Sequence, residues 1–352
     1  MTRFLTTILV GGIAAGGMIA APVASPAGPV RIFLLAGQSN MTGRGWLGNL
    51  NAPAADQKAS LVRYIKDPKH VEKYKYLYDG IKKDPNGWTV RNDVFVSYGE
   101  WPHPDPGQKE QSINRKHGAL CPGYGGTDGL GFGPEFGIGH VLGDYYADPV
   151  LLVKLSYGLN SLAANFRPPS SGGNPGDKYP MMVKAVQDAI ENLPRIIPGY
   201  DKRAGCQITG FFWNQGESDM NEKYAGEYEK NLVNLILDLR KEFKAPDMKS
   251  VIAVSGFGGW KDMLPRETHK DEDAMFIKAK RKVIGSQLAV AKRHEFYGMV
   301  AAVETREFWR DKRIHGEREY EIHWNGNGES YWLIGEAMGF SMVKLMKQTN
   351  TN

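Results

Sequence analysis

The sequence predicts an α/β protein built around a five-stranded parallel sheet. Five short apolar runs without a helical period alternate along the chain with segments whose apolar residues recur at helical spacing. Connections between parallel strands are nearly always right-handed crossovers, so this alternation predicts a sheet with helices on both faces. The predicted strands lie within residues 30–40, 149–156, 208–213, 250–255 and 297–303. The predicted helices lie near residues 131–142, 182–193, 232–243, 274–293 and 331–346.

The first apolar run, within VRIFLLAGQSN, ends at Gly37, and Ser39 follows two residues later. A buried strand that ends at a glycine predicts a tight exit, and open α/β sheets bind their ligands at the carboxyl ends of strands. Ser39 is therefore the candidate nucleophile. The alternative for this serine on its own is a helix cap or turn residue, which is the commoner role at such a position.

Composition favours one globular catalytic domain. Of 352 residues, 41% are hydrophobic and 24% are charged, enough for one substantial core. The 44 basic residues are scattered among 39 acidic ones, which argues against nucleic acid as the main partner. Cys121 and Cys206 are the only cysteines; they can pair in an oxidising compartment but define no disulfide framework.

Residues 1–27 are typical of a secretory signal peptide. Arg3 precedes an apolar, Gly/Ala-rich run over residues 4–21, and small residues ending at Ala27 close the segment. The alternative is an uncleaved anchor, because the run approaches a membrane-spanning length. We expect cleavage near Ala27, a secreted or periplasmic protein without stable membrane insertion, and a single domain over residues 28–352.

A long loop-rich insertion is predicted over residues 46–130, which lack a sustained period and are rich in Gly, Pro, Asp, Asn and aromatic residues. Loops of this length are uncommon in compact domains unless they carry function. The aromatic and histidine side chains here are candidates for a sugar-binding rim; the alternative is irregular surface held together by its own aromatics. They are Trp88, Tyr98, Trp101, His103, His117 and Tyr124.

Three polar clusters follow strand ends or precede the last helix, at residues 37–40, 214–219 and 322–325. All three should meet at one edge of the sheet. A serine hydroxyl needs a histidine base within hydrogen-bond reach, and that base needs a carboxylate to hold it. His323 is the candidate base, because it lies just before Asn-Gly-Asn-Gly (residues 325–328) and an amphipathic helix, whereas most other histidines lie in irregular or charged segments.

These clusters resemble a known family. GQSNM after the first strand, WNQGESD after the third and IHWNGNGESYWLIGEAMG before the last helix are similar to the sialate O-acetylesterase-type branch of the SGNH hydrolases, which includes carbohydrate esterase family six. Residues 154–171, KLSYGLNSLAANFRPPSS, also resemble a block of its bacterial members. The resemblance covers most of the mature chain and implies a flavodoxin-like three-layer sandwich.

The resemblance implies roles for individual residues. Ser39 becomes the nucleophile and His323 the general base and then acid. The oxyanion hole is then formed by the backbone N–H of Ser39, the N–H of Gly158 and the side-chain amide of Gln215. Removing one donor from such a site typically lowers the rate about a hundred-fold or more. Gly133 is a second candidate for the glycine role, and turn geometry is the alternative for either glycine.

The carboxylate of the triad departs from the wider SGNH pattern, which places an aspartate three residues before the histidine. That position is Tyr320 in this sequence. In the family-six esterases the glutamate of the QGE motif supports the histidine, which implies Glu217 here. Glu319 and Glu321 are alternatives, although Glu321 needs an unusual turn to reach the ring of His323.

The function that follows is an exported serine esterase that hydrolyses O-acetyl esters on carbohydrates through an acyl-enzyme. The resemblance implies acetylated xylan, sialic acid or a related glycan as the substrate, and we expect no metal and no organic cofactor. A lipase or thioesterase of the same fold is one alternative, which a wide apolar pocket would favour. A catalytically weak glycan-binding protein that uses the same cleft is the other.

Overall fold

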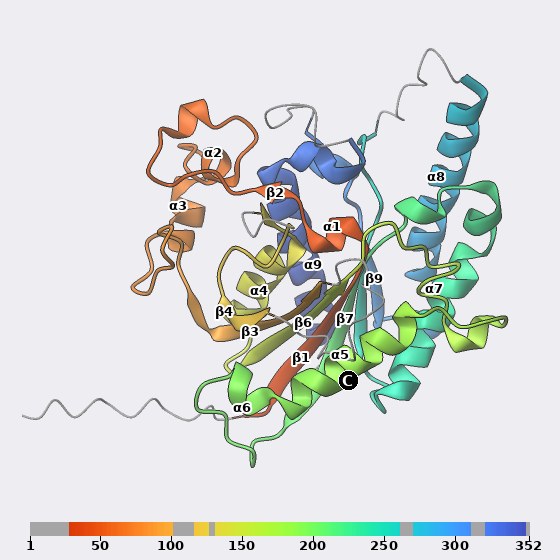
Figure 1. Ribbon diagram of the computed structural model, residues 1–352, viewed down its shortest axis with the longest axis horizontal. Coiled ribbons are helices and arrows are strands. Elements are labelled where there is room, and N and C mark those ends of the chain that lie inside the picture. The colour runs from red at the N-terminus through yellow and green to blue at the C-terminus, as the bar shows by residue number, and fades with distance from the viewer. Residues whose placement is uncertain (1–27, 101–115, 127–130, 261–269, 311–320, 350–352) are drawn as a thin grey trace, which may run out of the picture.

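A seven-stranded sheet forms the centre of the protein in a computed structural model that describes residues 28–100, 116–126, 131–260, 270–310 and 321–349. The strand order is β4-β3-β6-β1-β7-β8-β9, and every neighbouring pair is parallel except β3 and β4 (Figure 1). The sheet strands are β1 (Val30–Gly37), β3 (Arg91–Glu100), β4 (Lys116–Leu120), β6 (Val150–Ser156), β7 (Cys206–Asn214), β8 (Lys249–Ala253) and β9 (Val300–Val303). A small antiparallel pair consists of β2 (Gly45–Trp46) and β5 (Gly131–Phe132).

Helices lie on both faces of the sheet. The long helices α4 and α9 pack against each other behind the sheet in Figure 1, whereas α5 crosses in front of it. The longer helices are α4 (Pro134–Tyr145), α5 (Lys178–Glu191), α7 (Glu222–Glu242), α8 (Lys270–Val290) and α9 (Gly328–Thr349). The short helices are α1 (Ser39–Thr42), α2 (Leu61–Ile65), α3 (Val71–Tyr74) and α6 (Leu193–Ile196). All five predicted helices are therefore confirmed as elements, with shifted ends.

The prediction of five strands was too low. The five predicted strands are β1, β6, β7, β8 and β9, but β3 and β4 extend the sheet beyond β6. Both added strands fall inside the predicted insertion. In β3 the apolar residues Val94 and Val96 are buried and pair in register with β6, whereas β4 is a short edge strand with a glycine and mostly half-exposed residues. A short edge strand needs few apolar residues, so it leaves a weak sequence signal.

The prediction of a sugar-binding aromatic rim is also wrong for three of the six residues named for it. Trp88, Tyr98 and Tyr124 are only 1%, 5% and 4% exposed, so they belong to the core and cannot line an open rim. Trp88 packs edge-on against Phe136 of α4. His117 lies on β4, and the remaining candidates, Trp101 and His103, lie outside the described residues.

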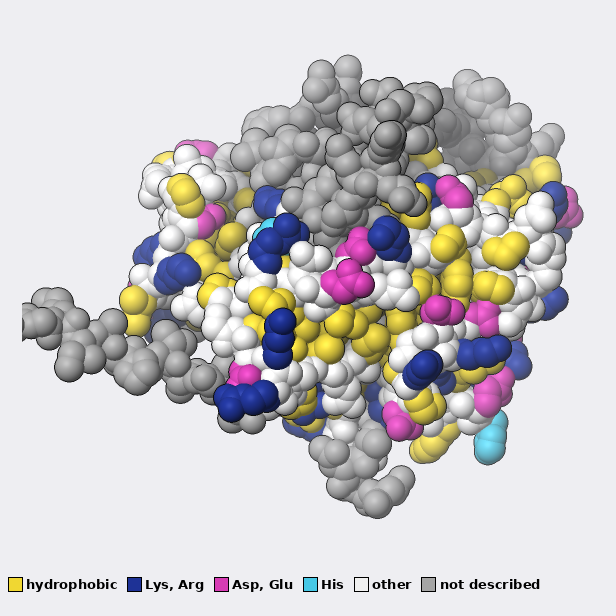
Figure 2. All heavy atoms as spheres, turned by 60° about the horizontal axis from the view of Figure 1, so that its bottom comes forward, with side chains coloured by type: hydrophobic (Ala, Val, Ile, Leu, Met, Phe, Trp, Pro, Cys, Tyr) yellow, Lys and Arg dark blue, Asp and Glu magenta, His cyan; other side chains and the backbone are white. Residues whose placement is uncertain are grey.

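Other surface features agree with the even charge distribution of the sequence. On the face shown in Figure 2, lysine and arginine side chains are interspersed with aspartate and glutamate side chains rather than gathered in one patch. Cys121 and Cys206 are both free thiols. Within the described part of the chain, none of the helices has the length and apolar character needed to cross a membrane.

Candidate active site

Ser39 lies at the carboxyl end of β1, where it begins the short helix α1, and it is 8% exposed. Gly37 permits this turn because β1 ends against the neighbouring strand β7. A Cβ atom on Gly37 would lie 2.0 Å from the carbonyl oxygen of Asn214, which no side chain tolerates. The close approach brings the first two predicted polar clusters together at one edge of the sheet.

His323 faces the serine across this edge. Its Nε2 atom lies 3.0 Å from Ser39 Oγ, a hydrogen-bond distance, although 284 residues separate the two in sequence. The histidine belongs to an irregular 3₁₀ segment, Glu321–Gly326, in which Trp324 and Asn325 adopt left-handed φ values of 55° and 53°. Such a backbone is costly for residues other than glycine and is maintained only where its surroundings hold it. The predicted pairing of nucleophile and base is thus present in the geometry.

The imidazole of His323 is held in its neutral form. Burial, as the larger cause, and the positive charge of Arg44 together lower its pKa to about 4. Arg44 follows α1 and has a buried Nε atom without a hydrogen-bond partner among the described residues. A neutral histidine next to a serine hydroxyl can accept its proton, which is what a general base requires. Sequence reasoning did not single out Arg44.

Glu217 reaches the histidine segment through Asn40, the residue after the nucleophile. Asn40 Nδ2 donates to Glu217 Oε1 at 2.6 Å and to the carbonyl oxygen of Ile322 at 2.9 Å. The hydroxyl of Tyr331 donates to Asn40 Oδ1 at 2.7 Å and lies 3.4 Å from the carbonyl oxygen of His323. Asn40 therefore ties the carboxylate to the backbone that carries the base, a role the sequence did not reveal.

The second carboxylate oxygen of Glu217 is buried without a hydrogen-bond partner among the described residues. Burial raises the pKa of this carboxyl, and its hydrogen bonds only partly oppose that shift. An unpartnered buried carboxylate oxygen is rare and costly, so it calls for a functional explanation. Of the alternatives for the acid, Glu321 begins the His323 segment, whereas Glu319 and the triad position at Tyr320 lie outside the described residues.

Gln215, the predicted side-chain donor of the oxyanion hole, is fully buried and already engaged. Its Nε2 atom donates to Gln38 Oε1 at 3.1 Å, to the carbonyl oxygen of Asn160 at 3.1 Å and to Asp219 Oδ2 at 2.6 Å. The hydroxyl of Tyr228 donates to Gln215 Oε1 at 3.1 Å. In this arrangement the amide holds three elements of the site together.

Asp219 anchors the loop that follows β6. Its two carboxylate oxygens accept the backbone N–H groups of Leu162 and Ala163 at 2.8 and 2.9 Å, in addition to the amide of Gln215. Burial raises its pKa to about 6 even though these hydrogen bonds favour the charged form. The position of Asp219 after the QGE motif gave no signal that distinguished this anchoring role from a cap or a solvated residue.

The two glycine candidates differ in what their N–H groups do. The N–H of Gly133 donates to Glu135 Oε1 at 2.9 Å, so it is occupied. Gly158 follows β6 by two residues and is exposed, and its N–H has no hydrogen bond to any described residue. The N–H of Ser39 is likewise without an acceptor among the described residues. Two backbone donors are thus available near the strand ends.

A buried ion pair fixes the other end of α1. Lys154 of β6 and Glu135 of α4 are 0% and 1% exposed, and Lys154 Nζ lies 2.7 Å from Glu135 Oε2. The same ammonium donates to the carbonyl oxygens of Thr42 at 2.8 Å and Tyr124 at 2.6 Å. A buried charge of this kind is tolerated only when it is paired and hydrogen-bonded, so this cluster is a rigid support for the serine turn. Within the part of the chain that the structure describes, no three His, Cys, Asp or Glu side chains gather as a metal site would require.

Comparisons with known proteins identify the family. The family described as carbohydrate esterase, sialic acid-specific acetylesterase matches residues 29–292. The chain belongs to this family. It is therefore a carboxylic ester hydrolase by descent, as the sequence motifs implied, whereas no curated protein sequence matches it.

Solved structures of the same fold include NanS, which is 13% identical with a TM-score of 0.50 over 93% of this chain and 100% of NanS. A protein from Arabidopsis thaliana is 18% identical with a TM-score of 0.49, over 90% of this chain and 98% of its own. A carbohydrate acetylesterase from Xanthomonas citri is 13% identical with a TM-score of 0.44, over 88% of this chain and 56% of its own. At these identities the NanS likeness shows a shared fold.

Proposed function

We propose that this protein is a serine esterase that removes O-acetyl groups from carbohydrates through an acyl-enzyme. The observation that carries the proposal is the 3.0 Å contact between Ser39 Oγ and Nε2 of a half-buried His323, whose lowered pKa favours the neutral imidazole. Membership of a carbohydrate esterase family supports the substrate class. The family description makes an O-acetylated sialic acid the first substrate to test, and acetylated xylan and related glycans follow.

In the proposed mechanism, His323 Nε2 takes the proton of Ser39 as Oγ bonds to the acetyl carbonyl carbon. The carbonyl oxygen becomes an oxyanion, and collapse of the intermediate breaks the bond to the sugar oxygen, which leaves with the proton that His323 returns. Water then attacks the acetyl-serine with His323 as base, and acetate is released. Glu217 is our candidate for the carboxylate that stabilises the imidazolium, acting from its Asn40-bound position.

For the oxyanion hole we propose the N–H groups of Ser39 and Gly158 as the main donors. Both lack acceptors among the described residues, which leaves them available to the substrate. The Gln215 amide joins them only if it exchanges one of its present acceptors for the oxyanion. Preorganised donors of this kind stabilise charge that develops only in the transition state.

The direct test is hydrolysis of an aryl acetate, an O-acetylated sialic acid and acetylated xylan by the purified protein and by Ser39→Ala. We expect the variant to lose about five orders of magnitude in kcat with an unchanged melting temperature. A chelator should leave the wild-type rate intact. Retained turnover in Ser39→Ala would refute the mechanism, and binding of glycans without any turnover by the wild type would favour a glycan-binding protein.

We also propose that the chain is exported, with residues 1–27 as a cleaved signal peptide and residues 28–352 as one SGNH-type domain. The composition of residues 1–27 supports the first part. The strand order β6-β1-β7-β8-β9, with helices on both faces, supports a flavodoxin-like layered arrangement. N-terminal sequencing of protein from the native host should begin near Gly28; a sequence that starts at Met1 or Thr2 would contradict export.

A further inference from the structure

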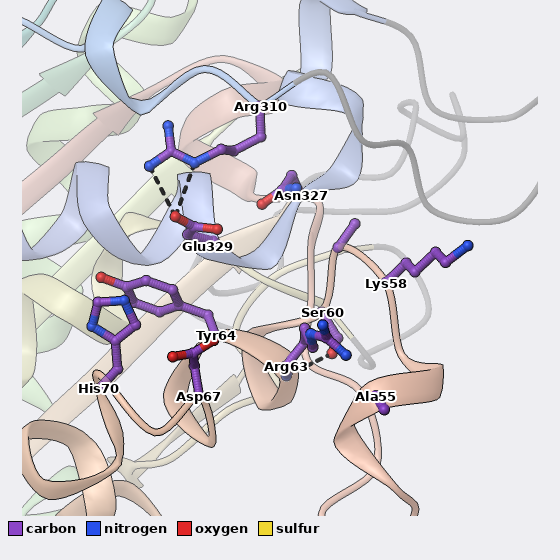
Figure 3. A pocket seen from close by; sticks show the side chains of 11 residues that line it. Ala55, Lys58, Ser60, Arg63, Tyr64, Asp67, His70, Arg310, Asn327 and Glu329 are labelled. Atoms are coloured by element: carbon purple, nitrogen blue, oxygen red, sulfur yellow. Dashed lines mark hydrogen bonds and ion pairs between the residues drawn. The ribbon is translucent and has the colours of Figure 1, made fainter.

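A cavity lies between the segment around α2 and the start of α9. The cavity has a volume of about 830 Å³. Figure 3 shows Tyr64, Asp67 and Arg63 on the α2 side, with Glu329 and Asn327 across from them. Ligand sites typically enclose about 300–1,000 Å³. This space is far larger than an acetyl group requires.

The cavity is connected to the catalytic histidine by a short stretch of chain. Asn327 lines it and lies four residues after His323, a separation that spans at most about 14 Å even when fully extended. The two walls are joined at this point, because the N–H of Gly328 donates to the carbonyl oxygen of Ala59 at 2.8 Å. A molecule that contacts Asn327 in the cavity therefore lies within a few sugar units of His323, whose Nε2 contacts Ser39.

The chemistry of the walls suits hydroxyl groups. Arg310 and Glu329 neutralise each other across 2.8 Å. Arg63 and Lys58, by contrast, are exposed and form no ion pair with any described residue; Arg63 Nη1 makes one long hydrogen bond of 3.5 Å, to the carbonyl oxygen of Ala54. Among the described residues, the side-chain carboxylate of Asp67 accepts only the backbone N–H of Lys69, at 2.9 Å. The cavity thus presents both free donors and free acceptor positions, the combination that sugar hydroxyls satisfy because each can donate and accept.

An aromatic surface completes the wall. The rings of Tyr64 and His70, both lining residues, lie 4.4 Å apart between centroids. Aromatic rings offer a rigid apolar face for a ligand that is apolar on one side and polar at its edges. A pyranose ring has this character, with C–H groups on its faces and hydroxyls around its rim.

We propose that this cavity is a second sugar subsite, which binds the unit attached to the acetylated sugar. Arg63 and Lys58 donate to its hydroxyl and ring oxygens, and Asp67 accepts from its hydroxyls. The inference rests on the proposed esterase function and adds that the enzyme prefers acetylated oligosaccharides to acetylated monosaccharides. Specificity of this kind comes from binding energy remote from the reacting ester.

The test compares matched substrate pairs: O-acetylated sialic acid with O-acetylated sialyllactose, and an acetylated xylose methyl glycoside with acetylated xylotetraose. An aryl acetate reports the chemistry alone. In Arg63→Ala, kcat/KM for the preferred oligosaccharide should fall about tenfold or more, the loss of one charged hydrogen bond. Monosaccharide and aryl acetate rates should stay within about twofold. Arg195→Ala, an exposed arginine on α6 at the far end of the sheet, is the matched control and should change nothing.

Failure of the subsite and failure of the esterase function give different results. The subsite is overturned if the double variant Arg63→Ala/Lys58→Ala keeps the wild-type ratio of kcat/KM for the oligosaccharide to kcat/KM for the monosaccharide. If the wild type hydrolyses aryl acetate but neither substrate pair, the proposed function fails instead. The subsite is then decided by calorimetric titration of wild type with unacetylated sialyllactose and xylotetraose, where absent binding, or binding that Arg63→Ala leaves unaltered, refutes it.

Discussion

The two sides of the site differ in how completely their buried polar atoms are satisfied. On the Gln215 side, the side-chain amide of Gln215 and the carboxylate of Asp219 are hydrogen-bonded to partners from three segments of the chain. On the Ser39 side, one oxygen of Glu217 and the Nε atom of Arg44 are buried without hydrogen-bond partners among the described residues. Because most buried polar atoms in proteins are paired, the contrast distinguishes a satisfied supporting network from a side that keeps open positions next to Ser39 and His323.

Two acidic residues on one turn make different contacts. Glu217 and Asp219 belong to the same 3₁₀ segment, and burial raises the pKa of both. Their contacts assign them different tasks: Asp219 holds backbone N–H groups, whereas Glu217 is bound through Asn40 to the segment of His323. Substitution of Glu217 should therefore lower turnover, whereas substitution of Asp219 should lower stability.

The largest expected effect is on turnover in Glu217→Gln. The amide keeps the volume and the oxygen that accepts from Asn40, but it removes the charge that stabilises the imidazolium. In a serine protease the same type of change cost about ten-thousand-fold in kcat. We expect a loss of that order by steady-state kinetics, with a melting temperature close to wild type.

Glu321→Gln and Glu319→Gln are the matched comparisons for Glu217→Gln, and both should be much milder. If either of them abolished turnover while Glu217→Gln stayed near wild type, the assignment of the acid would be wrong. If Glu217 only caps a helix, its substitution should cost about 1 kcal/mol of stability and little activity.

The next effect is on stability in Asp219→Asn. The substituted amide replaces one of the two acceptor oxygens with a donor, which then faces the N–H of either Leu162 or Ala163, so at least one buried donor loses its partner. The expected cost is about 3 kcal/mol in the free energy of unfolding, measured by denaturant titration. Asp188→Asn is the control, since Asp188 has one lysine partner that is half exposed, and it should cost less than about 1 kcal/mol. Equal costs at the two positions would remove the distinction between the networks.

The sequence predicted those parts of the fold that repeat a strong local pattern. The strands β1, β6 and β7 are buried apolar runs, and α5 and α7 have regular amphipathic spacing. The edge strand β4 and the helices α2 and α3 have five residues or fewer, and they are stabilised by tertiary contacts that no local pattern encodes. The prediction of a loop-rich insertion therefore missed these short elements within it.

The candidate site was predictable where a residue's role depends on its chemical type and its place at a strand end. Ser39 meets this condition at the end of β1, and His323 was singled out by its place just before the last helix, α9. Asn40, Asp219 and Arg44 do not meet the condition, because their roles depend on partners far away in the sequence, such as Ile322 and Leu162. Gln215 illustrates the reverse case: the motif marks it as important, but only the structure shows how many acceptors its amide already has.

A smaller effect is expected in Asn40→Ala, which removes the link between Glu217 and the His323 segment. We expect kcat to fall by about tenfold to a hundredfold with little change in KM, because a charge-assisted hydrogen bond is lost without any contact to the sugar. Tyr331→Phe should act in the same direction and more weakly.

Asn231→Ala is the control for Asn40→Ala. Asn231 is a buried asparagine of α7 whose side chain has no hydrogen-bond partner among the described residues, and the kcat of this variant should not change. A rise in KM alone would show that Asn40 positions substrate rather than the base.

The smallest expected effect is a shift in the pH profile on substitution of Arg44. In the proposed mechanism activity requires neutral His323, whose pKa is lowered from 6.5 to about 4, so the acid limb of log kcat/KM should lie near pH 4. Arg44→Gln removes a positive charge that disfavours the imidazolium, so the limb should move upward. It should remain below 6.5, because burial is the larger cause and persists in the variant.

Arg44→Lys is the matched control, because it keeps the positive charge and should keep the acid limb of the wild type. Circular dichroism at each pH separates titration of the base from acid unfolding. A wild-type limb near 6.5, or a limb that Arg44→Lys and Arg44→Gln shift equally, would show that neither burial nor this charge governs the histidine.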